Sequence, residues 1–193
     1  MDDSLNFNPP IALPAIERDT SALGFSMASE ARTGALLRTL AASKPGGAFL
    51  ELGTGTGIST AWILDGMDSA ATLSTVDSQA KCVEIAKRHL GHDQRVTFNV
   101  ESGDLFLSKL RGSYFDLIFA DTWPGKFDHL EDALDLLRAG GLYVIDDLLP
   151  QPSWPNGHAA KVPALVAELE RDQRLVLCKL SWSSGLIVAA RRC

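Results

Sequence analysis

The stretch Phe49-Leu50-Glu51-Leu52-Gly53-Thr54-Gly55-Thr56-Gly57 decides the fold of this chain. It is typical of a buried strand that ends near an acid and runs into a turn with three alternating glycines. The segment that follows, 58–64, can begin a helix. Glycines permit positive φ angles and a close approach of the backbone to a ligand, and a helix N-terminus offers unpaired N–H groups. The stretch therefore predicts a site for a small ligand with polar or charged groups.

The spacing of the glycines indicates which ligand this is. The dinucleotide fingerprint is G-x-G-x-x-G, whereas Gly53, Gly55 and Gly57 give the pattern E-x-G-x-G-x-G. The acid of this pattern, Glu51, would repel a pyrophosphate and attract a sulfonium or an amino group. The alternative is a tight structural turn that binds nothing.

A second acid supports the ligand-binding interpretation. The segment 72–77 is typical of a strand, and it ends at Asp77, 24 residues after Gly53 (77 − 53). A carboxylate at this place can accept hydrogen bonds from both hydroxyls of a ribose. The alternative is that Asp77 caps the helix that begins near Gln79.

With these glycines and acids, the chain resembles the class I S-adenosylmethionine-dependent methyltransferases. The resemblance extends from about Met27 to the C-terminus, and within the class the chain is most similar to the metal-dependent catechol and caffeoyl-CoA O-methyltransferases. The resemblance implies S-adenosylmethionine as the cofactor and a small molecule as the methyl acceptor. The expected cofactor-binding residues are Glu51, Gly53, Thr54, Gly55, Gly57, Ser59, Asp77, Ser102, Gly103, Asp104 and Asp121.

Alternating strand and helix patterns predict a single α/β domain over 1–193, with a doubly wound, Rossmann-like sheet of seven strands. The last two strands are so close in sequence that they must form an antiparallel hairpin, which leaves the sheet mostly parallel. Residues 1–26 contain three prolines and are interpreted as an N-terminal arm or lid. The predicted strands are 48–52, 72–76, 95–100, 114–120, 141–146, 174–181 and 186–190, and the predicted helices are 29–42, 58–66, 79–90, 103–110, 127–138 and 159–171.

Composition narrows the classes of function. A net charge of −6 without a long basic run argues against a nucleic-acid partner. No apolar run approaches the roughly 18 residues that a membrane helix needs, and the acidic start of the chain is unlike a signal peptide. Three widely spaced cysteines indicate a reducing cytoplasm rather than a disulfide framework. A homodimer is expected from the resemblance alone.

Three acids predict a metal site at the end of the sheet. Asp121 follows the fourth predicted strand, and Asp146 and Asp147 follow the fifth. Carboxylate oxygens suit a hard cation such as Mg²⁺, and the resemblance implies these three positions as metal ligands. The family has Asn where this chain has Asp147, so the chain carries an additional negative charge there. The alternative is that Asp146 and Asp147 cap loops and helix ends.

Lys126 and Asp121 are the predicted catalytic residues. A phenol titrates near pH 10, so its proton needs an acceptor or a metal that lowers its pKa. The resemblance implies a lysine base in a D-x-x-K run, and here the lysine comes two residues later, after Pro124-Gly125. The alternative for Lys126 is a solvated surface lysine.

Four other residues were candidates for the active-site end. Trp123 and Trp154 would either form the rim of an acceptor pocket or pack in the core. His158 is an alternative base, and His129 is predicted to lie within a helix with a structural role.

The predicted function is O-methylation of a small phenolic or catecholic acceptor by S-adenosylmethionine, assisted by a divalent metal. Two alternatives are retained: a metal-independent methyltransferase of another small molecule, and a non-catalytic protein that binds S-adenosylmethionine.

Overall fold

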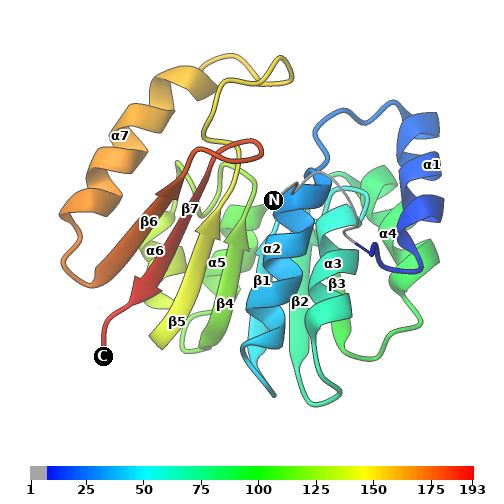
Figure 1. Cartoon of the computed structure of the whole chain (residues 1–193), viewed down its shortest axis with the longest axis horizontal. Helices are drawn as coiled ribbons and strands as arrows, with labels where there is room; N and C mark the ends of the chain where they lie inside the picture. The colour runs from blue at the N-terminus through cyan, green and yellow to red at the C-terminus, as the bar shows by residue number, and fades with distance from the viewer. Residues whose placement is uncertain (1–7) are drawn as a thin grey trace.

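The computed structural model describes residues 8–193, which form one seven-stranded sheet with helices on both faces (Figure 1). The strand order is β3-β2-β1-β4-β5-β7-β6, and only β7 runs antiparallel to its two neighbours. The fold class predicted from the sequence is therefore confirmed. The strands are β1 (Ala48–Leu52), β2 (Thr72–Asp77), β3 (Val96–Val100), β4 (Phe115–Ala120), β5 (Leu137–Ile145), β6 (Leu175–Leu180) and β7 (Leu186–Arg191).

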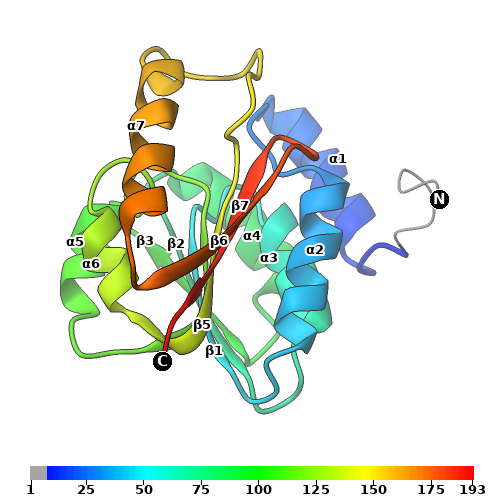
Figure 2. The ribbon, with the colours of Figure 1, turned by 60° about the vertical axis from the view of Figure 1, so that its left-hand side comes forward.

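The helices form two layers, which Figure 2 separates clearly. Helices α1 to α4 cover one face of the sheet, and α5 to α7 cover the other. The helices are α1 (Leu13–Leu23), α2 (Ala31–Ala42), α3 (Ile58–Gly66), α4 (Ala80–Leu90), α5 (Gly103–Lys109), α6 (Leu130–Asp135) and α7 (His158–Arg171).

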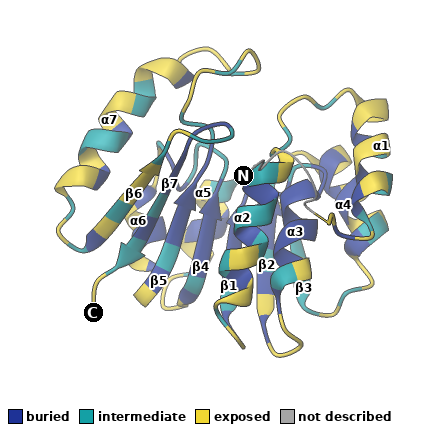
Figure 3. Ribbon diagram, viewed as in Figure 1, coloured by how far each residue is buried: buried dark blue, intermediate teal, exposed yellow. Residues whose placement is uncertain are grey.

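Alternation along the central strands produces these two layers. Successive strand side chains point to opposite faces, so Phe49 and Leu117 pack with α1 to α4, whereas Leu50 and Ile118 pack with α5 to α7. All four side chains are fully buried. Figure 3 accordingly shows buried central strands, with the exposed residues on the outer faces of the helices. Strands buried on both faces are the expected result of parallel pairing.

The strand order reverses between β1 and β4, and this reversal places the site. Ligands of open α/β sheets bind where the order reverses, beyond the carboxyl ends of the strands. The Gly53 N–H donates to the Val76 carbonyl (3.0 Å), and the Asp121 N–H donates to the Leu52 carbonyl (2.9 Å). The glycine turn and the first predicted metal ligand therefore leave the sheet side by side.

The predicted helix 127–138 is wrong at both ends. Residues 123–128 form turns, α6 covers only Leu130–Asp135, and β5 begins at Leu137 rather than at residue 141. The leucines looked helical because they recur every three or four residues. Leu137 instead pairs with Phe115 of β4, across an irregularity in the register. Pairing with a neighbouring strand thus overrides the local helical period.

The N-terminal segment 1–26 contains α1, and residues 1–7 lie outside the described part. Leu13 and Ile16 of α1 are buried against the layer that contains α3 and α4. The hydroxyl of Thr20 lies 2.7 Å from that of Thr56 in the glycine turn. This contact ties α1 to the glycine turn, and a lid role for the segment stays a prediction. Within residues 8–193, the helices are too short or too polar to cross a membrane.

Candidate active site

The turn after β1 has the positive φ angles that its glycines predict. Gly53, Gly55 and Gly57 have φ angles of 111°, 50° and 93°, which L side chains rarely adopt. Space is also restricted at the outer two. A Cβ at Gly53 would lie 2.8 Å from the Thr122 side chain, and a Cβ at Gly57 would lie 2.8 Å from the Ala86 Cβ. Glycine is therefore required here for both conformation and packing.

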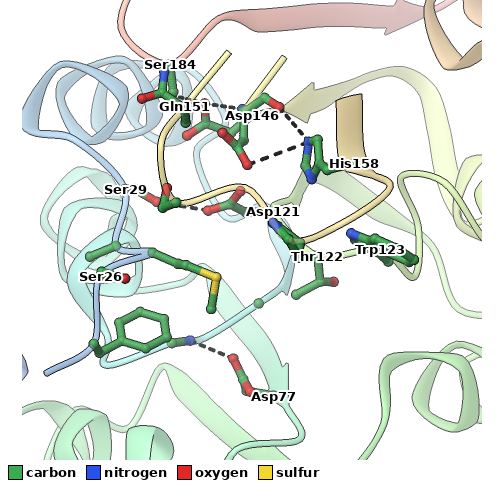
Figure 4. A pocket seen from close by; sticks show the side chains of 18 of the residues that line it. Ser26, Ser29, Asp77, Asp121, Thr122, Trp123, Asp146, Gln151, His158 and Ser184 are labelled. Atoms are coloured by element: carbon green, nitrogen blue, oxygen red, sulfur yellow. Dashed lines mark hydrogen bonds and ion pairs between the residues drawn. The ribbon is translucent and has the colours of Figure 1, made fainter. Parts of the chain in front are cut away.

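Asp77 closes the turn from the second strand. Its Oδ2 accepts a hydrogen bond from the Gly55 N–H (2.9 Å), and its Oδ1 accepts one from the Gln79 N–H (2.8 Å). Asp77 therefore holds the turn that leads into α4, but the N-cap of α4 is Gln79 and no side chain of the described residues caps this helix, so the alternative of a helix cap is not borne out. Asp77 also lines a cavity (Figure 4). Gly53 and Gly55 line the same cavity. The two roles are compatible, and ribose binding stays a prediction.

Glu51 lies beneath the turn rather than in the cavity. It is fully buried, and its Oε2 accepts hydrogen bonds from the hydroxyls of Thr60 (2.5 Å) and Thr75 (2.6 Å). Its Oε1 has no hydrogen-bond partner among the described residues. Burial raises the pKa of Glu51 from 4.5 to about 7, against the opposing effect of these hydroxyls. The acid thus supports the turn from inside the protein.

The other predicted cofactor residues divide into two groups. Thr54 and Ser59 are buried below the turn, where they line a small secondary cavity. Ser102, Gly103 and Asp104 stand at the start of α5 and line neither of these two cavities. A Cβ at Gly103 would lie 2.8 Å from the Pro124 side chain, so this corner packs against the loop after β4.

The cavity that Asp77 lines has a volume of about 420 Å³ and continues from the glycine turn to the predicted catalytic residues. Asp121, Lys126, Asp146 and Asp147 all line it. Figure 4 shows Asp121 facing Ser29, which precedes α2, and the Ser29 hydroxyl donates to Asp121 Oδ2 (3.2 Å). The sequence-predicted cofactor turn and catalytic residues therefore share one cavity.

Lys126 is buried, so the alternative of a solvated surface lysine is wrong. Only 2% of its side chain is exposed, and its Nζ donates to the carbonyl oxygen of Asp146 (3.1 Å). The same Nζ lies 3.8 Å from Asp121 Oδ1. The turn 123–128 folds back on itself and carries the lysine inward, since three N–H groups of this turn donate to the Trp123 carbonyl.

The acids around Lys126 are poorly solvated. Burial, reinforced by the charge of Asp146, raises the pKa of Asp121 from 3.8 to about 8, although Lys126 opposes the change. Burial also raises the pKa of Asp146, whose Oδ1 accepts hydrogen bonds from the Ser184 hydroxyl and the Asp147 N–H. A cationic ligand would favour the ionised form of these acids.

Asp147 is held differently from the other two acids. Its φ angle is 65°, and its Oδ1 accepts a hydrogen bond from Trp154 Nε1 (2.5 Å). His158 Nε2 donates to the Asp147 carbonyl (2.9 Å) and lies 3.7 Å from its Oδ2. Burial lowers the pKa of His158, which favours the neutral ring.

The three acids do not form a metal site as their side chains lie. Within residues 8–193, His, Cys, Asp and Glu side chains nowhere gather in a group of three or more that could hold a metal ion. Their oxygens are hard ligands, but Asp121, Asp146 and Asp147 each have one oxygen bound to a protein donor. The arrangement of these side chains does not fit a metal ion.

Aromatic rings cover the cavity on the side of α7. His158 stacks on Trp154 (centroids 4.4 Å apart) and meets Phe127 edge-on (4.8 Å), and Phe127 meets Trp123 edge-on (5.9 Å). Trp123 lines the cavity as predicted for a rim, whereas Trp154 is held by stacking. His129 does not lie within a helix, because it precedes α6 with a φ angle of 58° and pairs with Asp132.

Sequence reasoning missed several side chains of the site. Phe25, Met27 and Ser29 come from the segment before α2, and Ser184 comes from the turn between β6 and β7. Ser184 had a signal in the sequence, because a hairpin strand beside β5 returns its turn to the end of β5. The segment before α2 has no periodic pattern that would have identified it.

A family model places this fold and site among known proteins. The model described as a methyltransferase domain matches residues 50–148, which is 99 of 193 residues (148 − 50 + 1). A predicted O-methyltransferase from Mycolicibacterium paratuberculosis is 30% identical over 171 residues, which cover 82% of this chain and 76% of that protein. The chain belongs to this methyltransferase family. The resemblance to the class I S-adenosylmethionine-dependent methyltransferases is confirmed.

Solved structures of other proteins have the same fold. The O-methyltransferase TomG from Streptomyces achromogenes, in complex with SAM, superposes with a TM-score of 0.85 at 22% identity over 98% of this chain and 93% of that one. The cofactor-bound protein Rv0187 from MTB superposes with a TM-score of 0.85 at 25% identity over 98% of this chain and 94% of that one.

Proposed function

We propose that this methyltransferase transfers the methyl group of S-adenosylmethionine to an oxygen of a small phenolic or catecholic acceptor. One observation carries the proposal. A single cavity of about 420 Å³ is lined by Gly53, Gly55 and Asp77 at one end and by Asp121 and Lys126 at the other. A donor on the glycine turn would therefore face an acceptor beside the buried lysine. The O-methyltransferase names of the relatives are consistent with this chemistry.

The glycine turn and Asp77 would hold the donor. The turn presents its backbone to the cavity, and Asp77 offers two carboxylate oxygens that accept hydrogen bonds from ribose hydroxyls. S-adenosylmethionine, when bound, supplies an electrophilic methyl group on a sulfonium. The buried acids attract this positive charge, since Coulomb interactions strengthen away from bulk water.

Lys126 and Asp121 would handle the acceptor proton. The acceptor oxygen must lose its proton as it attacks the methyl carbon, and the C–S electron pair leaves with the sulfur. Asp121, with a pKa of about 8, is a stronger proton acceptor than an ordinary carboxylate. Lys126 lies 3.8 Å from it and can take the proton as an amine or stabilise the oxyanion as an ammonium.

A flat acceptor suits the walls of the cavity. Phe25, Met27 and Trp123 line it beside the polar groups, and aromatic and apolar side chains favour planar ligands. A phenol also matches the need for a proton acceptor, because its ordinary pKa near 10 leaves it neutral at physiological pH.

Metal assistance remains a prediction of the resemblance, and the placement of the acids favours the metal-independent alternative. Methylation of a catechol in the presence of excess chelator decides between them. Retained activity supports direct proton transfer to the protein. Loss of activity that Mg²⁺ restores would mean that Asp121, Asp146 and Asp147 rearrange around an ion.

Calorimetry with S-adenosylhomocysteine, followed by methyl transfer to a panel of phenols and catechols, tests the proposed function. Binding together with turnover supports the enzyme. Binding without turnover on the whole panel supports the non-catalytic alternative. Tighter binding of a nicotinamide dinucleotide would contradict the assignment.

We also propose where the protein is located and which oligomer it forms. A cytoplasmic location follows from the few, widely spaced cysteines, and a homodimer follows from the resemblance. Light scattering after size-exclusion chromatography measures the second directly.

A further inference from the structure

The segment 148–157, which we call the acceptor loop, builds one wall of the cavity. It connects β5 to α7 and contributes Gln151, Ser153 and Pro155 to the lining. Figure 1 shows it as a long excursion above the strand ends. It contains no helix or strand. Backbone hydrogen bonds hold its start to Ser184 and Gly185 and join Trp154 to Gln151, and side-chain contacts add to them.

Three side chains tie this loop together at one point. Trp154, from the loop, donates its Nε1–H to Asp147 Oδ1, and His158, the first residue of α7, donates to the Asp147 carbonyl. The rings of Trp154 and His158 stack with an interplanar angle of 21°. The two ends and the interior of the loop therefore meet at Asp147.

The backbone of Asp147 indicates that this point is under constraint. Asp147 is one of four non-glycine residues with positive φ in the described part of the chain. Aspartate adopts this conformation more readily than most non-glycine residues, and it persists where the surroundings favour it. Here the two hydrogen bonds and the stacked rings impose it, because they fix both the side chain and the carbonyl.

We propose that Asp147, Trp154 and His158 form a latch that positions the acceptor loop, and that Asp147 serves as its anchor rather than as a metal ligand. The proposal rests on the proposed function, because that function makes the cavity beside the loop a site for the methyl acceptor. The latch itself is a property of the free protein. His158 lies against the rings of both Trp154 and Phe127, and it is 2% exposed, so it is the fixed side of the latch.

The latch predicts an effect on acceptor binding that a metal ligand would not produce. Trp154→Phe removes the indole N–H but keeps an aromatic ring to stack on His158. It should raise the KM for the acceptor roughly 10- to 100-fold, the scale of a hydrogen bond to a charged group. The kcat and the affinity for S-adenosylhomocysteine should change little, because the glycine turn and Lys126 are untouched.

Amide hydrogen exchange tests the latch without turnover. Trp154→Phe and Asp147→Ala should each speed exchange in the acceptor loop, and the double variant should add little to either. Asp147→Asn keeps an oxygen that can accept from Trp154 and should restore slow exchange. Asp135→Ala removes an exposed carboxylate of α6 and serves as the matched control, with no change expected in the loop.

The outcomes separate the latch from the proposed function. Unchanged loop exchange in both Trp154→Phe and Asp147→Ala, with the fold intact by thermal melting, overturns the latch. Additive effects of the two substitutions overturn it as well. Faster exchange in the variants of a protein that methylates none of the tested acceptors would leave the latch standing while the proposed function fails.

Discussion

One half of the cavity is formed mainly by backbone, and the other half is formed mainly by side chains. The half expected to hold the cofactor comes from one stretch, 53–79, and offers mainly the backbone of a turn in which Gly53 and Gly55 line the cavity at positive φ. The half proposed to hold the acceptor comes from the separate segments 25–30, 121–126 and 146–158, together with Ser184, and offers mainly side chains. The positions of these side chains depend on how deeply each is buried and on the contacts among them.

This difference determines how each half responds to substitution. A backbone cradle depends on local conformation, so a change there should act through strain or through one ligand contact. The acceptor half depends on a balance of charges, with the acids Asp121 and Asp146 set against Lys126. Removing one charge there should disturb all the others.

The largest effect is expected at Lys126. Lys126→Met should lower kcat roughly 10²–10⁴-fold, the usual scale for loss of a general acid or base, while the affinity for S-adenosylhomocysteine stays nearly constant. Steady-state kinetics and calorimetry measure the two quantities. Lys44→Met is the matched control, because Lys44 also donates to a backbone carbonyl but is only partly buried and lies outside the cavity. A small rate loss that stays small across pH would place the proton acceptor elsewhere.

The second effect is a pH dependence of stability in the cofactor half. The folded pKa of Glu51, about 7, lies above its ordinary value of 4.5. The contribution of Glu51 to the free energy of unfolding is therefore fully present below about pH 4.5, and it is lost as the pH rises through 7. Glu51→Gln mimics the protonated acid. Above pH 7 it should raise the free energy of unfolding, relative to that of the unsubstituted protein, by up to about 3 kcal/mol.

Urea denaturation of both proteins at pH 4 and pH 8 measures this difference. The two free energies of unfolding should agree at pH 4 and separate at pH 8. The comparison isolates Glu51, because Asp121 and Asp146 are present in both proteins. A constant offset across this range would mean that Glu51 remains ionised in the folded protein.

The third effect tests the ribose contact. Asp77→Ala should weaken binding of S-adenosylhomocysteine by roughly 1–3 kcal/mol, the value of hydrogen bonds to a charged group. Asp68→Ala is the matched control, since Asp68 also accepts from backbone N–H groups but stands outside the cavity, before β2. Equal affinity of the Asp77 and Asp68 variants would leave Asp77 only its hydrogen bonds to the Gly55 and Gln79 N–H groups.

The smallest effect concerns the shape of the turn. Gly57→Ala places a Cβ against Ala86 at a φ of 93°, whereas Gly112→Ala has a φ of 87° with no atom within 4 Å of its Cβ. Both should lose roughly 1 kcal/mol or more of stability to backbone strain. Gly57→Ala should lose more, because Ala86 must also move. Equal melting temperatures would mean that the packing at Gly57 relaxes freely.

The sequence by itself determined the sheet and the cofactor half. The alternation of strands and helices, the antiparallel hairpin and the glycine turn all follow from patterns that are local: periodicity, spacing and residue type. Asp77 could be assigned to the cavity because its place is fixed by the end of a strand. These features need only neighbours in the sequence or the rule that parallel strands end at one edge.

Only the tertiary structure decided the acceptor half. The sequence could not distinguish a buried Lys126 from a solvated one, because its burial depends on a turn that folds back beneath Asp146. Nor could it show that one oxygen of Asp147 is bound by Trp154. Spacing determines where a strand ends, whereas the direction of a carboxylate and its pKa depend on side chains brought together from distant segments.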